Sequence, residues 1–128
     1  MSKTSEKPTI FVTRRWPDAA EEALKQYFTP TFNEQDVPLT AAQIAAGFAS
    51  HDALAPTVSD QITADIIAAG AAGSGRLIAN FGVGVNHIDL AAAASAGLAV
   101  SNTPGVLTDA TADLALTLML MVSRRAGE

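Results

Sequence analysis

Residues 77–111, LIANFGVGVNHIDLAAAASAGLAVSNTPGVLTDAT, decide the fold of this chain. The stretch begins with an apolar run, residues 77–81, which predicts a buried strand. A turn with glycines at positions 82 and 84 follows, and an alanine-rich helix then runs to Gly97. A second strand at residues 98–100 completes a strand–turn–helix–strand unit. Ligands of open α/β sheets bind at the carboxyl ends of the strands, which is where this turn is expected.

The rest of the chain repeats the same alternation of strands and helices. Short apolar or β-branched runs predict strands at residues 9–13, 31–33 and 52–56. A first helix is expected to start at Pro17 and to stop at Pro30, and a third is expected over residues 62–69. The second helix is expected after an N-cap at Thr40, with a buried face made of Ala41, Ile44, Ala45 and Phe48. The pattern predicts an α/β fold, a flavodoxin-like doubly wound parallel sheet of about five strands with flanking helices.

The last predicted helix, residues 108–125, has an unusual composition. Its segment 114–122, LALTLMLMV, is apolar on nearly every side. A helix that packs on one face of a sheet has a polar stripe facing water, so this helix is expected to have partners on opposite sides. We expect a bare apolar face to drive self-association into a homo-oligomer such as a dimer.

Composition excludes several classes of protein. The 128 residues are 48% hydrophobic and carry a net charge of −5, so neither a disordered chain nor a nucleic-acid partner is expected. The absence of cysteine removes disulfide and thiolate metal sites. The polar N-terminus does not resemble a signal peptide, and the longest apolar run is too short to span a bilayer. We therefore expect a cytoplasmic protein with no membrane partner.

The glycine turn allows two interpretations. Gly82 and Gly84 begin a G-x-G-x-x-G pattern, but His87 stands in place of the third glycine, so the dinucleotide fingerprint fails. The turn either relieves steric strain or lets backbone N–H groups approach an anion. His51 and His87 have no carboxylate at a motif spacing, so no general base and no metal site is predicted.

Two segments of the chain resemble a known family. The runs ANFGVGVNHIDL and SNTPGVLTDATADLALTLML are similar to those of the D-isomer-specific 2-hydroxyacid dehydrogenases, and within them to the glyoxylate and hydroxypyruvate reductases. The resemblance implies a flavodoxin-like substrate-binding (catalytic) domain at residues 1–107. Residues 108–128 would form an interdomain helix leading to an NAD(P)-binding domain absent from this chain. The chain is thus expected to be an N-terminal fragment.

The same resemblance implies a set of site residues. The backbone N–H groups of Val83 and Gly84 would hold the substrate carboxylate, and the side chains of Leu54, Thr57 and Val58 would contact its carbon skeleton. Two further positions would face the nicotinamide of the cofactor, Leu107 and Thr111. The alternatives are an ordinary strand end at residues 54–58, core packing of Leu107, and a helix N-terminal hydrogen bond at Thr111. Two more positions stand out, Asn86, where the family usually has aspartate, and Asp89, a plausible helix N-cap.

The function implied by the resemblance is NAD(P)-dependent reduction of a 2-oxo acid, glyoxylate or hydroxypyruvate, to the D-2-hydroxy acid. The arginine, glutamate and histidine of the family's catalysis match no residue of this chain, so the chain alone is expected to be inactive and to bind no cofactor. The alternative is a stand-alone flavodoxin-like binding module without catalysis. A phosphoacceptor receiver domain is disfavoured, because the strand at residues 9–13 is not followed by clustered acidic residues.

Overall fold

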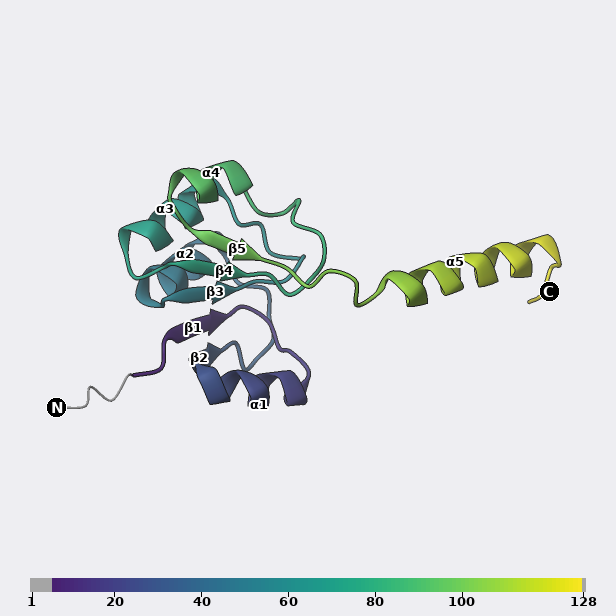
Figure 1. The fold of residues 1–128 in the computed structure, drawn as a ribbon, viewed down its shortest axis with the longest axis horizontal. Helices are drawn as coiled ribbons and strands as arrows, with labels where there is room; N and C mark the ends of the chain where they lie inside the picture. Colours follow the sequence, from purple (N-terminus) through teal and green to yellow (C-terminus); the bar gives the residue numbers. More distant parts are fainter. Residues whose placement is uncertain (1–5, 128) are drawn as a thin grey trace.

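The structure, a computed structural model, describes residues 6–127 and contains one five-stranded parallel sheet (Figure 1). The strands lie in the order β2-β1-β3-β4-β5, the flavodoxin-like order predicted from the sequence. The elements, in chain order, are β1 (Thr9–Val12), α1 (Asp18–Tyr27), β2 (Thr29–Phe32), α2 (Ala41–Ser50), β3 (Ala53–Ala55), α3 (Ala64–Ala72), β4 (Leu77–Ala79), α4 (Leu90–Ser95), β5 (Ala99–Ser101) and α5 (Thr108–Ser123).

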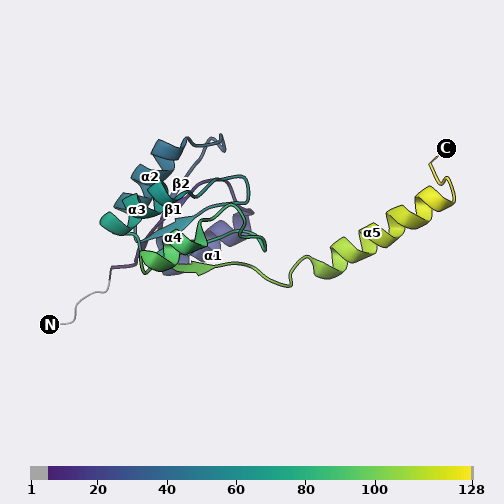
Figure 2. The ribbon, with the colours of Figure 1, turned by 90° about the horizontal axis from the view of Figure 1, so that it is seen from above.

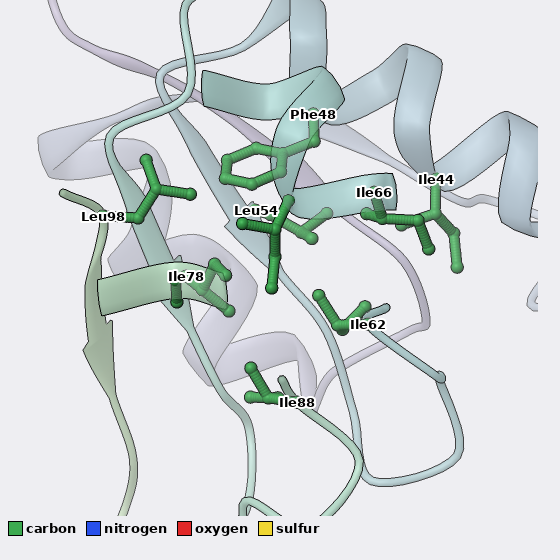
Figure 3. Close-up of a cluster of buried hydrophobic side chains, with 10 residues drawn as sticks. Ile44, Phe48, Leu54, Ile62, Ile66, Ile78, Ile88 and Leu98 are labelled. Atoms are coloured by element: carbon green, nitrogen blue, oxygen red, sulfur yellow. The ribbon is translucent and has the colours of Figure 1, made fainter. Parts of the chain in front are cut away.

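Helices cover both faces of the sheet, as Figures 1 and 2 show. On one face, α2, α3 and α4 enclose the larger core, which Figure 3 shows around Phe48 and Leu54. On the other face, α1 covers a smaller core that contains Ile10 and Val12 of β1. In β1, Ile10 and Val12 point towards α1 and are fully buried, whereas Phe11 points to the opposite face and is partly buried against the larger core. The sheet therefore provides a rigid frame for the loops at its carboxyl edge.

The sequence-based expectations differ from the structure in four places. Pro30 does not stop α1, which ends at Tyr27, and lies within β2, an edge strand where a missing N–H is tolerated. Ala41 is exposed, while Ile44 and Phe48 are buried as predicted. Ile62 lies before α3 because its N–H donates to His87 O, at 2.8 Å. The third helix does not end at residue 69, because α3 continues through Gly70 and ends at Ala72, with Gly73 as its C-cap.

The last helix, α5, projects away from the body of the molecule (Figures 1 and 2). The sequence predicts one bare apolar face, but the structure leaves every side of α5 exposed, and none of its residues is buried. The exposed large apolar side chains are Leu114, Leu116, Leu118, Met119, Leu120, Met121 and Val122. Among residues 6–127, no helix combines the length and apolar character needed to cross a membrane.

The Asp52 carboxylate joins the start of β3 to the start of the neighbouring strand β1. Asp52 Oδ2 accepts hydrogen bonds from both the backbone N–H and the hydroxyl of Thr9, each at 2.7 Å. These bonds, the backbone one foremost, lower the pKa of the Asp52 carboxyl. The ionised form is thus favoured by folding, so its contribution to stability is present above the ordinary carboxyl pKa and is lost as pH falls through the lowered pKa.

We expect Asp52→Ala to reduce the free energy of unfolding near neutral pH by about 1–2 kcal/mol, because it removes two hydrogen bonds to a charged group. The difference from wild type should shrink in acid. Urea unfolding followed by circular dichroism, near neutral pH and in acid, measures the free energy of unfolding of both proteins. Glu34→Ala, at an exposed carboxylate with no ion pair or hydrogen bond in the described part of the chain, is the control. An equal loss at both pH values would contradict the assignment.

Candidate functional site

The candidate site lies at the carboxyl edge of the sheet, where the glycine loop (residues 82–84) follows β4. Gly82 has φ of 156° and lies close to Val58, since a Cβ at position 82 would lie 2.7 Å from Val58 Cγ1. Only glycine fits both the backbone conformation and the space there. The close approach brings the glycine loop against the loop that follows β3.

Side-chain amides hold the carbonyl groups of the glycine loop. Asn80, which is 3% exposed, donates through Nδ2 to Gly82 O at 3.0 Å and to Gly84 O at 2.9 Å. Asn102 Nδ2, beyond the end of β5, donates to Val83 O at 2.9 Å. All three carbonyls of the loop are therefore held by side chains.

The N–H of Gly82 donates to Asn80 O at 3.1 Å, but the N–H groups of Val83 and Gly84 have no such partner in the described part of the chain. Within residues 6–127, no backbone or side-chain group accepts a hydrogen bond from the N–H of Val83 or Gly84. Backbone N–H groups without an acceptor are uncommon unless water or a ligand satisfies them. Two adjacent free donors are therefore available to an anion at this edge.

The loop that follows β3 forms the opposite wall of the site. Asp60 is buried, and its Oδ2 accepts hydrogen bonds from Thr13 Oγ1 at 2.6 Å and from Thr57 N at 2.9 Å. Phe81 N donates to Pro56 O at 2.9 Å and ties this wall to β4. These bonds fix the position of Val58, which is 58% exposed and faces the glycine loop.

An apolar pocket of about 620 Å³ lies between these two walls, with Val58 on one side and the glycine loop on the other. Its lining residues are Val58, Phe81, Gly82, Val83, Gly84, Thr103, Val106 and Leu107. A smaller hollow of about 330 Å³ shares Val58 and Gly84 with it and extends towards His87. The larger pocket has room for a small organic acid beside the free N–H groups.

The structure brings together four of the seven predicted site residues in the apolar pocket, namely Val58, Val83, Gly84 and Leu107. Leu54 does not line it, because its side chain has no exposed surface and packs in the larger core. Thr57 bonds to Asp60 and to Ser59 instead of facing the pocket. Thr111 lies on exposed α5, where its N–H donates to Leu107 O, as its helix N-terminal alternative requires.

The two histidines are not arranged as general bases. His51 follows α2 as its C-cap, and its ring contacts Thr31 Oγ1 and Gly47 O. His87 Nε2 lies 2.9 Å from Asn80 Oδ1. Partial burial lowers the pKa of His87, against the opposite effect of the Asp60 carboxylate, so the imidazole is neutral near neutral pH. In the described part of the chain, no group of three or more acidic or histidine side chains could hold a metal ion.

The described residues do not supply the groups that would hold the phosphates of a dinucleotide. Val106 and Leu107 offer an apolar wall that suits a flat ring, but the failed glycine fingerprint supplies no cradle for a pyrophosphate. A complete dinucleotide does not fit these residues alone. No hydride-transfer step is therefore assigned to them.

Sequence patterns did not identify the residues that hold the two loops. Asn80 lies inside an apolar run that predicts a strand, and Asp60 and Asn102 belong to no motif. The signal that could have found Asn80 is its polarity, because a polar side chain at a buried strand end requires hydrogen-bond partners. Asp89 is the N-cap of α4, as predicted, and accepts from Ala92 N at 2.9 Å.

Known proteins of similar sequence and fold form one group. Residues 10–125 match the D-isomer specific 2-hydroxyacid dehydrogenase catalytic domain. The chain is 36% identical over 122 residues to the glyoxylate reductase of Thermococcus kodakarensis, a match that covers 95% of this chain and 36% of the relative. It therefore spans only about a third of the length of the curated relatives that it matches.

Solved structures give the same result. A D-isomer specific 2-hydroxyacid dehydrogenase of Polaromonas sp. JS6 66 is similar with a TM-score of 0.81 and 38% identity, over 90% of this chain and 36% of that one. An NADPH-dependent glyoxylate/hydroxypyruvate reductase of Sinorhizobium meliloti, in complex with NADP and malonate, is similar with a TM-score of 0.72 and 30% identity, over 91% of this chain and 34% of that one.

Proposed function

Because the chain belongs to the D-isomer specific 2-hydroxyacid dehydrogenase family, we propose that it is the substrate-binding part of an NAD(P)-dependent reductase. The whole protein would reduce a 2-oxo acid, glyoxylate or hydroxypyruvate, to the D-2-hydroxy acid. The similarity to glyoxylate reductases supports this choice of substrate. The division into a substrate domain at residues 1–107 and an interdomain helix at 108–128 is part of the same proposal, and a cytoplasmic location stays a prediction.

The observation that carries the proposal is the pair of free N–H groups beside the apolar pocket. A carboxylate can accept hydrogen bonds from the N–H groups of Val83 and Gly84 whatever side chains surround them. The short carbon chain of a 2-oxo acid would then contact Val58 in a pocket whose lining carries no charged side chain. Malonate, present with NADP in the Sinorhizobium meliloti relative, is likewise a small carboxylate.

The chain's own residues would bind and orient the substrate, and the chemistry would need groups from outside residues 6–127. Leu107 would form an apolar wall for the nicotinamide, and Thr111 would lie beside it at the start of α5. When bound, the cofactor supplies the hydride. Since the described residues offer neither a pyrophosphate cradle nor an acid–base pair, the isolated chain would be inactive and would bind no cofactor by itself.

We expect the purified 128-residue chain to oxidise neither NADH nor NADPH with glyoxylate or hydroxypyruvate, while still binding the carboxylate. Titration with glycolate, followed by ¹H–¹⁵N NMR, should shift the Val83 and Gly84 amide signals, and glycolamide, which lacks the charge, should not shift them. Turnover by the isolated chain would refute the assignment of chemistry to absent residues. Equal shifts with both ligands would refute the carboxylate site.

We also propose that the chain forms homo-oligomers, such as dimers, through α5 and the residues after it, 108–125. The support is the exposure of apolar side chains on every side of this helix. The same exposure weighs against the alternative of a stand-alone flavodoxin-like binding module, because an independent module would be expected to have a polar outer surface on its last helix.

A further inference from the structure

We propose that Asn80 and Asn102 are positioning residues that aim the N–H groups of Val83 and Gly84 at the substrate carboxylate. The inference rests on the proposed function, because it takes those two N–H groups as the carboxylate donors. It explains why the N–H groups of Val83 and Gly84 keep fixed directions although the glycine loop is pliable.

The argument follows from the geometry of the peptide group. In a trans peptide, the C=O of one residue and the N–H of the next lie in one plane and point in opposite directions. Asn80 Nδ2 holds Gly82 O together with the N–H of Thr103, at 3.1 Å, so the N–H of Val83 points away from Asn80. Asn102 holds Val83 O, so the N–H of Gly84 points away from Asn102. Each held carbonyl therefore fixes the direction of one donor.

The orientation of the Asn80 amide is itself fixed. Its nitrogen donates to two carbonyls, so a rotation by 180° would place Oδ1 against two carbonyl oxygens. Oδ1 can only accept, so His87 must donate to it through Nε2–H. Both the neutral Nε2–H tautomer and the imidazolium can do this, so the arrangement survives protonation of His87.

These hydrogen bonds are needed because glycine makes the loop pliable. Gly82 and Gly84 flank the peptide groups in question, and glycine opposes a peptide rotation less than other residues do. A rotated peptide would present a carbonyl oxygen to the carboxylate, which is repulsive. The buried, fully hydrogen-bonded Asn80 amide and the Asn102 amide prevent that rotation before the substrate arrives, which lowers the cost of binding.

The test compares three variants of the 128-residue chain. Asn80→Asp keeps the size of the side chain and removes both donors, and Asn102→Ala removes the other donor at an exposed position that should not affect folding. Asn86→Ala is the matched control, because Asn86 is exposed, lies just after the loop, and makes no side-chain hydrogen bond in the described part of the chain. Folding of each variant is checked from its ¹H–¹⁵N spectrum.

Two quantities are measured for each variant. One-bond N–H residual dipolar couplings give the directions of the Val83 and Gly84 N–H bonds without ligand, and a glycolate titration gives the affinity. We expect Asn80→Asp to change the coupling of Val83 and Asn102→Ala to change that of Gly84. We expect each to weaken glycolate binding about tenfold. Asn86→Ala should change neither quantity.

The outcomes separate this inference from the proposed function. Unchanged couplings, or wild-type affinity in both loop variants, would overturn the positioning role. If the wild-type chain shows no carboxylate-specific shift at Val83 and Gly84, the proposed carboxylate site fails, and the purpose assigned to the positioning fails with it. The couplings would still decide whether the asparagines hold the peptides. Should Asn80→Asp not fold, Asn102→Ala alone decides through Gly84.

Discussion

Replacing Phe48 with alanine is expected to lower the free energy of unfolding by about 3–5 kcal/mol, which is a large share of the stability of a domain of this size. The Phe48 side chain on α2 has no exposed surface and belongs to the larger core, where it lies beside Leu54 (Figure 3). Its ring fills the space beside Gly70 and Gly75, which have no side chains to close a cavity after truncation. Urea unfolding followed by circular dichroism measures the loss.

The contact between Phe48 and Gly70 makes a sharper test. A Cβ at position 70 would lie 2.2 Å from Phe48 Cδ1, well inside contact distance. Alanine in place of a helical glycine normally stabilises by about 1 kcal/mol, but the overlap with an enclosed ring costs about 1–3 kcal/mol. We therefore expect Gly70→Ala alone to be destabilising.

The double variant should reveal the coupling. Once Phe48→Ala has removed the ring, Gly70→Ala gains helix propensity without overlap, so the double variant should lose less stability than the sum of the two single losses. Ala19→Gly is the control partner for Phe48→Ala, because Ala19 is exposed on α1, on the opposite face of the sheet. The stability losses of Phe48→Ala and Ala19→Gly should therefore add in their double variant. Additive losses for positions 48 and 70 would contradict the packing described here.

The alternation of strands and helices could be predicted because the burial of each element repeats along the sequence. β1 and β4 are apolar runs, and β3 is buried at every residue, so their patterns are strong. Pro30 misled the prediction, because a proline both ends helices and fits an edge strand, and only the sheet order shows that β2 is an edge. Whether a proline ends a helix or lies in an edge strand is therefore decided by the strands that neighbour it in space.

From the residue pattern alone, only the backbone of the candidate site could be predicted, while Val58 and Leu107 of the pocket lining were expected from the family resemblance. The glycines at 82 and 84 indicate a turn at a strand end, and a turn there indicates exposed N–H groups. Asn80 bonds to carbonyls only two and four residues away, but Asn102 is distant in sequence from Val83, and Asp60 is distant from Thr13. Hydrogen bonds between distant residues leave no periodic signal, so these roles came only from the structure.

Substituting two leucines of α5 with glutamate is expected to turn a self-associating chain into a monomer. Leu116 and Leu120 are four residues apart and therefore lie on one side of the helix, and they are 58% and 67% exposed. A helix of this length with apolar side chains on every side gains most from burial against another copy, because water contacts all of them in the single chain. Two buried, unpaired carboxylates would remove that gain.

The control must add the same charge without touching α5. Ala91→Glu with Ala94→Glu does so on the exposed side of α4, and it takes the net charge from −5 to −7, as the leucine variant does. Light scattering at tens of micromolar protein should then give a monomer for the Leu116→Glu and Leu120→Glu variant, and an oligomer for wild type and control. A wild-type monomer would contradict self-association through α5. An oligomer in all three samples would place the interface on the body of the molecule instead, because charge on α5 would then leave it intact.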